Sequence, residues 1–531
     1  MSFGRFVIAG LLILLAHAEL PAQSGQLWRA DDRVLLSDFG YVGAIATDQR
    51  RVYAATANGL EIYDYTSQRW ELPSTAEDGY PVGERPTALV HDPLQSELIL
   101  ATSSGLVSNI WRLRLIDGRW ERGPSVQTRA IVAIIPASSL ADDAFYLRTA
   151  DGWMRLGRIG IFADPISPAQ VPDDVRARAV SLIERIERDP GFSAWEPQLG
   201  FDRFRRRWAL TSAAEEEYGS GVWVGRAGGN LARFDTRTYR IENIEFGLVS
   251  RGTSAVAQDP TGFLWFGSDG RGQRIGLTRV SADLARTTRF ESGFERVPSR
   301  AVTQILPVGD TLWVAALDGL YRCAPCTDFG EGRWERFGEV DGLPAMEVTT
   351  IAESRGSVWV GTRRGLVRWT GERGAARMVG ERINRIAVYG DTLLVASDRG
   401  LWLLPADDTA ADGRAAPAPV PGGRIVDVTA AGADIVATDG RNLYRRRNGT
   451  WSGPERIDQE TGRVTRLRAT PTHLWVAGER GVAAQDLTTG AWQSFRVPDD
   501  VPEGPVTDLL AGDGHVWLAT AAGAFRIMLR R

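Results

Sequence analysis

Lysine is missing from this sequence: all 62 of its basic residues are arginine. That absence excludes lysine Schiff-base chemistry and the lysine of a P-loop. Histidine is scarce, with four copies, and there are two cysteines. The sequence has no HExxH, P-loop or EF-hand pattern. We therefore expect no catalytic residue, no metal ion and no cofactor.

Strong charge of either sign is also missing. The formal net charge is −4, which gives no reason to expect nucleic acid or an anionic membrane surface as a partner. Beyond the N-terminus, no apolar run approaches the ~20 residues that cross a bilayer. We expect no nucleic-acid partner and no membrane span in the mature chain.

The N-terminus, residues 1–22, has the pattern of a secretory signal peptide. Arg5 precedes an apolar stretch at 6–15, and Ala16-His17-Ala18 offers a cleavage site, with Ala22 as an alternative. A membrane anchor is the less favoured interpretation, because the stretch is shorter than ~20 residues. We expect an exported bacterial protein, periplasmic or extracellular at the cell surface.

The two cysteines form the short motif Cys323-Ala-Pro-Cys326. Residue 327 is threonine, so the c-type haem pattern fails, and a lone CxxC cannot supply four zinc ligands. A structural disulfide or a redox dithiol remains. The disulfide is favoured in an exported protein.

What the chain does contain is a repeated hairpin, seen most clearly at 357–369. The run Val358-Trp359-Val360 breaks at a polar turn, and a second alternating run starts at a glycine that we expect at positive φ. The turn glycines recur, mostly 35–49 residues apart, at Gly59, Gly105, Gly152, Gly229, Gly270, Gly319, Gly365, Gly400, Gly440, Gly481 and Gly523. A period of ~40–45 with four strands per unit indicates β-propeller blades.

The tryptophans follow the repeat. Six occupy its second strand, where we expect them in the blade cores: Trp223, Trp265, Trp313, Trp359, Trp475 and Trp517. An aromatic sugar-binding platform is the alternative interpretation of these residues. Their strand position favours a structural role.

Eleven blades exceed the ~4–8 of one ring, so the sequence predicts an all-β fold of two propellers. We expect a first propeller of four to five blades over 23–247 and a second of seven blades over 248–531. A helical pattern near 170–190 is either an insertion or the replacement for a degenerate blade. The strand-like segment before residue 37 is suited to closing a ring from the opposite end of the chain, and 239–246 is a candidate closing strand for the second ring.

The hairpin Val-Trp-Val-Gly-Thr-x-x-Gly-Leu-x-Arg resembles the two-component regulator propeller repeat. The best copies lie at 222–233, 264–279, 312–322, 358–368, 474–482 and 516–526. The resemblance implies sensor propellers, often paired, ahead of a membrane helix and a kinase. Neither follows here, so we expect a stand-alone exported form; similar exported propellers serve secretion or surface assembly, and streptogramin-lyase-like enzymes are more distant relatives.

The histidines argue against the lyase branch. His91, His473 and His515 align with turn positions of the repeat, so we expect none on the strands that line a channel. His473 and His515 at one rim of adjacent blades are the alternative interpretation. A catalytic Ser-His-Asp arrangement is not indicated.

Arginines at aligned positions of the inner strands are the better candidates for binding. Arg382, Arg424 and Arg463 share one position, which holds Glu347 one blade earlier. Three residues further on, a second position holds Arg385, Asp427, Arg466 and Asp508. The hypothesis is a site for an anionic or polyhydroxylated ligand such as a glycan. The alternative is that these charges pair with one another and close the channel mouth.

Together these observations favour an exported, non-catalytic β-propeller that binds a ligand or a partner protein in a sensor-like or scaffold role. A repeat protein offers a wide, rigid surface, which suits recognition. The alternative is a propeller-fold lyase or hydrolase acting on a polysaccharide or small molecule.

Overall fold

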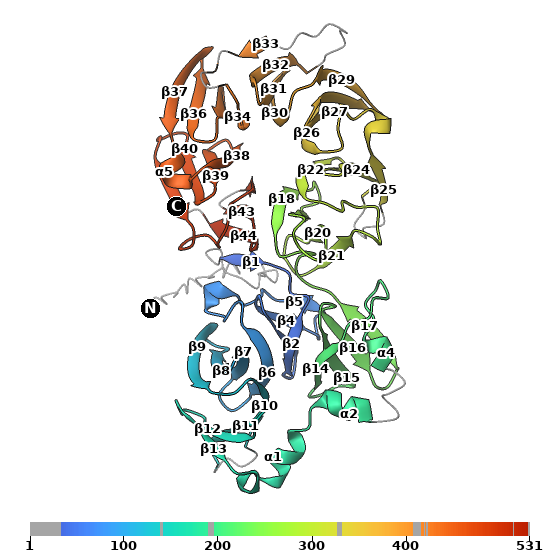
Figure 1. Cartoon of the computed structure of the whole chain (residues 1–531), viewed down its shortest axis with the longest axis vertical. Coiled ribbons are helices and arrows are strands. Elements are labelled where there is room, and N and C mark those ends of the chain that lie inside the picture. The colour runs from blue at the N-terminus through green and yellow to red at the C-terminus, as the bar shows by residue number, and fades with distance from the viewer. Residues whose placement is uncertain are drawn as a thin grey trace, which may run out of the picture.

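The computed structural model describes residues 33–137, 142–188, 196–326, 332–406, 416–418, 420, 423–512 and 515–528. The expected signal peptide over 1–22 lies outside the described residues. The described chain forms eleven four-stranded antiparallel sheets arranged as two rings (Figure 1). The predicted all-β fold of two propellers built from about eleven blades is confirmed.

Four sheets form the first ring, the lower one in Figure 1. Their strands, written from the innermost outward, are β2 (Val42–Thr47), β3 (Arg51–Thr56), β4 (Leu60–Asp64), β5 (Arg69–Trp70); β6 (Arg85–Asp92), β7 (Glu97–Ser104), β8 (Val107–Arg114), β9 (Arg119–Val126); β10 (Ile131–Pro136), β11 (Ala144–Thr149), β12 (Trp153–Gly157), β13 (Ala163–Ile166); β14 (Leu210–Glu215), β15 (Gly221–Arg226), β16 (Leu231–Asp235) and β17 (Arg240–Ile244).

Helices stand between the third and fourth sheets of this ring. Those between the two sheets are η2 (Pro168–Gln170), α1 (Asp173–Arg178), α2 (Leu182–Arg188) and α4 (Glu196–Leu199). Elsewhere in the described residues the helical elements are η1 (Ala76–Asp78), η3 (Glu339–Asp341) and α5 (Asp458–Thr461). Helix α1 contacts the inner strand β10, and α2 contacts the inner strand β14. Val175 of α1 is buried against Ile135 and Tyr146. The helical segment therefore takes the place of a fifth blade.

Seven sheets form the second ring, and their inner strands contact one another in cyclic order. The first four sheets are β18 (Thr253–Gln258), β19 (Leu264–Ser268), β20 (Gly276–Val280), β21 (Thr287–Glu291); β22 (Val302–Val308), β23 (Thr311–Ala316), β24 (Gly319–Ala324), β25 (Arg333–Phe337); β26 (Val348–Ser354), β27 (Ser357–Thr362), β28 (Gly365–Thr370), β29 (Arg373–Val379); β30 (Ile383–Tyr389), β31 (Thr392–Ser397), β32 (Gly400–Pro405) and β33 (Ala416–Ala418).

The remaining sheets complete the circle. They are β34 (Asp427–Ala431), β35 (Asp434–Thr438), β36 (Asn442–Arg447), β37 (Thr450–Arg456); β38 (Val464–Ala469), β39 (His473–Gly478), β40 (Gly481–Asp486), β41 (Trp492–Arg496); and β42 (Asp508–Ala511), β43 (His515–Thr520), β44 (Gly523–Met528) with β1 (Val34–Leu36).

Strand β1 closes the second ring. It pairs antiparallel with β44, with Val34 opposite Arg526 and Leu36 opposite Ala524. The prediction that the N-terminal segment closes a ring from the opposite end is confirmed. The suggestion that 239–246 closes the second ring is wrong, because β17 is the outer strand of the β14 sheet. Since β1 links the two parts of the chain, the division into 23–247 and 248–531 stays a prediction.

Turn glycines hold the outer strands in place. Gly365 has φ 153°, and a Cβ at this residue would collide with the carbonyl oxygen of Met378 in the outer strand β29. Gly523 has φ 144°, and a Cβ at this residue would collide with the carbonyl oxygen of Leu36 in β1. Both positions combine a backbone that favours glycine with a close approach of the neighbouring strand.

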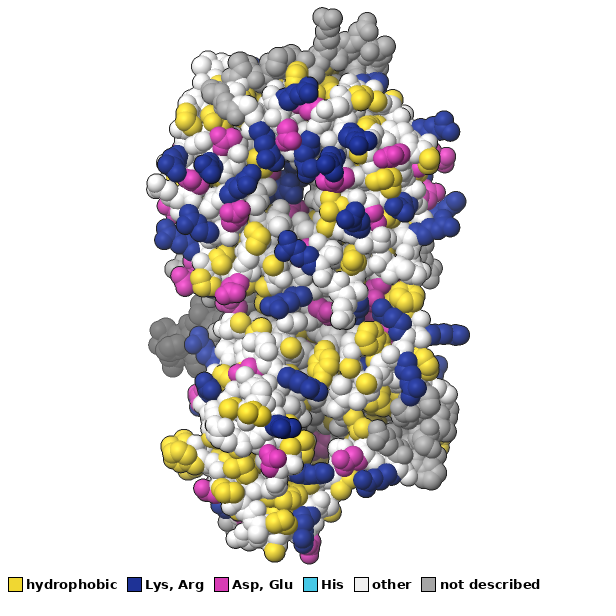
Figure 2. All heavy atoms as spheres, in the orientation of Figure 1, with side chains coloured by type: hydrophobic (Ala, Val, Ile, Leu, Met, Phe, Trp, Pro, Cys, Tyr) yellow, Lys and Arg dark blue, Asp and Glu magenta, His cyan; other side chains and the backbone are white. Residues whose placement is uncertain are grey.

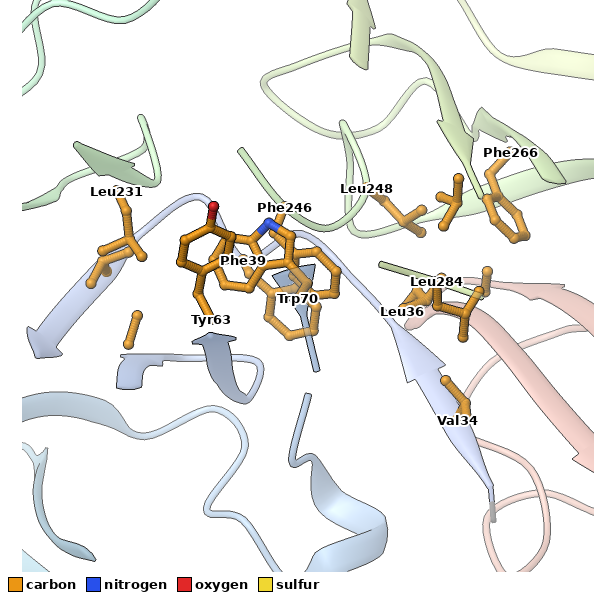
Figure 3. Close-up of a cluster of buried hydrophobic side chains, with 14 of the residues drawn as sticks. Val34, Leu36, Phe39, Tyr63, Trp70, Leu231, Phe246, Leu248, Phe266 and Leu284 are labelled. Carbon is orange, nitrogen blue, oxygen red and sulfur yellow. The ribbon is translucent and has the colours of Figure 1, made fainter. Parts of the chain in front are cut away.

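The two rings share a buried apolar cluster. Trp70 of the first ring stacks on Phe246 with ring centroids 4.7 Å apart, and Phe39 stacks on Phe246 at 5.7 Å. Figure 3 shows this cluster continuing through Leu248 to Leu284 and Phe266 of the second ring. Because one core runs through the junction, we expect the rings to resist hinge motion.

Candidate functional site

Each ring is organised around its inner strands, and most of these carry a β-bulge near their start. In β30 the register shifts between Ile383 and Arg385, and the same shift occurs in β22, β26 and β38. A bulge re-aims the side chains around it. The residue after the bulge, which we call the post-bulge residue, meets its counterparts from neighbouring blades.

In the second ring a connected polar belt, the channel belt, consists of four post-bulge residues and two aligned residues at the starts of β34 and β42: Gln304, Thr350, Arg385, Arg466, Asp427 and Asp508. The post-bulge residue of β18 is Ala255, which is not part of it. Asp427 lies between two arginines: Arg385 Nε is 3.6 Å from its Oδ1, and Arg466 Nη1 is 3.8 Å from its Oδ2. Arg466 Nε also lies 3.1 Å from Asp508 Oδ1. Three of the predicted ligand-binding residues, Arg385, Asp427 and Arg466, are thus brought together, and they face one another.

The channel belt also binds backbone. Asp427 Oδ2 accepts the Leu467 N–H at 2.9 Å, and Asp508 Oδ2 accepts the Val256 N–H at 3.2 Å, each from the next blade. Gln304 Oε1 accepts the Ile351 N–H at 3.1 Å and a guanidinium N–H of Arg385 at 2.9 Å. These contacts join inner strands around the circle.

Burial makes the channel belt sensitive to loss of any partner. The Asp427 side chain is fully buried, and that of Arg385 is 5% exposed. Burial lowers the pKa of the Arg385 guanidinium well below its ordinary value; nearby Arg468 and Arg466 lower it further, and Asp427 opposes them. Three arginines around buried carboxylates depend on those carboxylates for compensation.

A second set of polar side chains links the same strands nearer their start. In this set, the donor belt, each side chain donates a hydrogen bond to a backbone carbonyl at or next to the start of the inner strand of the next blade. Its members are Ser254, Thr303, Thr349, Asn384, Thr465 and Thr507. Thr349 Oγ1, for example, donates to the Ile383 carbonyl at 2.6 Å. The position between β34 and β38 holds Val426, which has no donor. Sequence reasoning missed this set, although the alignment that singled out the arginines would also have aligned these residues.

The remaining predicted arginines lie at the channel mouth. Arg382 Nη1 is 3.3 Å from Glu347 Oε1, and the two side chains are 39% and 28% exposed. Arg424 Nε is 3.0 Å from Asp398 Oδ1, a pair about half exposed. Arg463 is exposed and forms no ion pair with another described residue. The mouth is therefore lined by guanidinium groups that are only partly paired.

Neighbouring turns add further arginines to this mouth. Backbone hydrogen bonds hold each turn beside the start of an inner strand: the Asp398 N–H donates to the Arg382 carbonyl and the Glu479 N–H to the Arg463 carbonyl. We call this surface the entry rim; it comprises eight arginines and four acids, namely Arg363, Arg364, Arg382, Arg399, Arg424, Arg441, Arg463, Arg480, Glu347, Asp398, Asp439 and Glu479. Figure 2 shows arginine side chains gathered around the hollow at the centre of the upper ring.

The first ring uses the post-bulge position differently. The residues there are small: Ala44, Ala88, Ala133 and Ser212. Together with α1, α2 and their connection they border a cavity of about 410 Å³. A cavity of this size lies within the ~300–1,000 Å³ of small-molecule sites. Sequence reasoning missed this cavity.

The histidines are dispersed. His473 Nδ1 lies 2.9 Å from Thr472 Oγ1 at the start of β39, and His515 begins β43. His91 lies in the inner strand β6, opposite Leu98. The expectation that no histidine lies on an inner strand is therefore wrong, because β6 continues to Asp92 before turning. His91 stacks on Tyr53 at 6.4 Å, and partial burial lowers its pKa.

The other predicted site residues lie in a disulfide or in the cores of the blades. Cys323 and Cys326 are joined as a disulfide, with Cα atoms 5.3 Å apart. The six second-strand tryptophans, Trp223, Trp265, Trp313, Trp359, Trp475 and Trp517, are at most 7% exposed and lie in the cores of their blades. Within the described residues no cluster of three or more His, Cys, Asp or Glu side chains could hold a metal ion. Among the same residues there is no helix of the length and apolarity that a bilayer crossing requires.

Comparisons with known proteins give structural matches only. No protein-family model and no curated protein matches the chain. The extracellular domain of the putative hybrid two-component system BT4673 of B. thetaiotaomicron matches with a TM-score of 0.44 and 13% identity, covering 92% of this chain and 69% of that one. PorZ, a surface component of the type-IX secretion system of Porphyromonas gingivalis, matches at 0.44 and 12%, covering 92% and 74%.

A third match covers about half of this chain. An inactive virginiamycin B lyase of Staphylococcus aureus gives a TM-score of 0.43 and 14% identity, covering 52% of this chain and 95% of its own. At these identities and scores the likenesses carry no information on function.

Proposed function

We propose that this chain is an exported, non-catalytic binding module, and that the entry rim of the second ring receives an anionic ligand. The observation that carries the proposal is the combination of exposed, partly paired arginines at the mouth with buried, mutually paired charges beneath them. Export rests on the N-terminal pattern at 1–22.

The charges of the rim support an anionic ligand. Arg463 lacks an ion pair within the described part of the chain, and Arg382 and Arg424 each have one acid of the preceding blade as partner. An incoming carboxylate or sulfate can accept charge-assisted, bidentate hydrogen bonds from such groups. The acidic partners already present are partly exposed, 28% for Glu347 and 43% for Asp398, so displacing them costs little.

The closed channel favours binding over catalysis. The channel belt fills the space below the rim with side chains that hold one another, and the described histidines are dispersed among β6, β39 and β43. An enzyme needs a nucleophile or base at hydrogen-bonding distance from an orienting group in one pocket. The rim instead offers a broad surface for an extended acidic glycan.

The test is titration calorimetry with oligogalacturonate as the acidic probe and maltoheptaose as the neutral, polyhydroxylated one. Replacing Arg382, Arg424 and Arg463 together by alanine should weaken oligogalacturonate binding more than tenfold. A matched triple variant of exposed first-ring arginines, Arg119, Arg237 and Arg240 to alanine, should bind as the unsubstituted protein does. Equal affinity of the rim variant and the unsubstituted protein would remove the rim from the proposal.

A further inference from the structure

Two cavities of the first ring share part of their lining. One cavity of about 410 Å³ lies on the side of α1 and α2, and a second of about 560 Å³ opens at the starts of the inner strands. Thr87, Val132, Leu210 and Thr211 border both cavities. The two cavities therefore adjoin at these residues, and we call the pair the first-ring passage.

Most residues that border the 410 Å³ cavity are apolar, but Arg178, Arg185 and Glu215 border it as well. Val132, the second residue of the inner strand β10, is 46% exposed even though it sits inside the ring. Around it lie alanines, Leu89, Ile134 and Leu210. Covering apolar surface of this kind with an apolar ligand is favourable, because water is released from it.

One mouth of the passage is positively charged. Arg85 and Arg129 both border the 560 Å³ cavity, together with Tyr41, and none of the described carboxylates borders it. Both arginines are exposed, and neither forms an ion pair with another residue that the structure describes. Arg382 and Arg424 of the second ring, by contrast, each have an acidic partner. The guanidinium groups of the first-ring mouth are therefore available to an anion.

On the helix side of the passage Arg185 pairs with Glu215, and Arg178 pairs with Asp174. The arginines without an ion pair in the described structure therefore lie at the other mouth, and the apolar residues around Val132 lie between. We propose that the first-ring passage binds a linear amphipathic anion, an alkyl chain that carries one carboxylate. The carboxylate lies at the mouth with Arg85 and Arg129, and the alkyl chain runs inward past Val132. The absence of a fifth blade makes room for this chain, because α1 and α2 close the ring less tightly than an inner strand would. This site is separate from the entry rim and does not depend on the function proposed for the rim.

A chain-length series tests the apolar part. Hexanoate, octanoate and decanoate, each below its micelle-forming concentration, are titrated into the full chain by calorimetry. We expect one site per chain and an affinity that rises up to about fourfold per methylene group. Affinity that does not change with chain length, or binding that does not saturate, would overturn the proposal.

Two sets of variants separate the head group from the tail. Arg85→Gln with Arg129→Gln should weaken decanoate more than tenfold and leave decanol unchanged, because decanol lacks the charge. Val132→Trp should abolish binding of both by filling the passage. Arg240→Gln, on the outer strand β17, is the matched control for the loss of an exposed arginine and should change neither.

Val132→Asp provides a second test of the passage, since it places a charge beside the alkyl chain without adding bulk. Unfolding curves establish that each variant is folded. Decanoate binding that survives both Val132 variants would show that the ligand lies elsewhere and would overturn the proposal. If the rim triple variant of the second ring loses its acidic glycan but keeps decanoate, the two sites are independent, as proposed.

Discussion

At the post-bulge position and its aligned counterparts, six of the seven inner strands of the second ring carry polar side chains and β18 carries Ala255, whereas the first ring carries alanines and a serine. Arg385, Asp427 and Arg466 fill the centre of the seven-bladed ring with ion pairs. Ala44 and Ala133 occupy the same register in the four-bladed ring and leave a cavity. One backbone position thus closes one channel and leaves the other open. The chemistry of a propeller channel is set at this position more than by the blade itself.

The two rings also differ in their number of blades and in how each ring is completed. Seven blades leave a wide centre, which the channel belt fills, and β1 completes the last sheet. The first ring has four blades and completes its circle with α1 and α2.

The largest difference should come from removing a central carboxylate. Asp427→Ala leaves Arg385 and Arg466 buried without their shared partner and frees the Leu467 N–H. We expect a loss of about 3–5 kcal/mol in the free energy of unfolding. Ser212→Ala, at the equivalent position of the first ring, should cost less than about 1 kcal/mol, because Ser212 Oγ has no hydrogen-bond partner in the described structure. Urea unfolding measures both, and equal losses would contradict the contrast.

A smaller effect is expected at the closing strand. Gly523→Ala combines an unfavourable φ with a collision against the Leu36 carbonyl oxygen, and we expect a loss of about 3 kcal/mol. Gly105→Ala in the first ring has positive φ but open space, so about 1–2 kcal/mol is expected. Thermal unfolding compares the two. A smaller loss at Gly523 than at Gly105 would mean that β1 contributes little to closure.

The donor belt can be completed by one substitution. Val426→Thr would place a hydroxyl at the one junction, between β34 and β38, that lacks a donor. The gain should be about 0.5–1 kcal/mol, the net contribution of one hydrogen bond. Thr349→Val should lose a similar amount, because its hydroxyl donates to the Ile383 carbonyl. Denaturant midpoints decide this, and destabilisation by Val426→Thr would show that the junction cannot use a donor.

The smallest expected effect is on the stability of each ring at low pH. Asp202 in the first ring and Asp259 in the second each accept an indole N–H at 2.9 Å, from Trp208 and Trp265. The pKa of each carboxyl is lowered: burial opposes ionisation, but hydrogen bonds and a nearby arginine outweigh it. Stability from a lowered carboxyl pKa is present above the unfolded value of ~3.9 and is lost as pH falls through the folded value.

Asp259→Asn should therefore flatten the fall in unfolding free energy below pH 4, and Asp202→Asn should do the same in the other ring. Unfolding measured between pH 2 and pH 5 shows this slope. If the slope of unfolding free energy against pH were unchanged in both variants, other carboxyl groups would be responsible for the loss of stability in acid.

The sequence was sufficient to predict the blades and much of the second-ring centre. Trp359 and Gly365 repeat at nearly constant spacing, and the aligned arginines proved to be neighbours. Alignment could not show that Arg385 is buried and Arg382 exposed, since the β-bulge between them changes which way each side chain points. It also could not predict the first-ring cavity, because alanines such as Ala133 resemble ordinary strand residues.

Thiol accessibility at the post-bulge position is the most direct test of the contrast between the channels. Both native cysteines are in the disulfide, so an introduced cysteine reports alone. Ala133→Cys in the first ring and Thr350→Cys in the second are treated, folded, with a small methanethiosulfonate reagent. The account predicts that Ala133→Cys reacts at least tenfold faster than Thr350→Cys, whose position is fully buried in the channel belt. Equal rates at the two positions would contradict it.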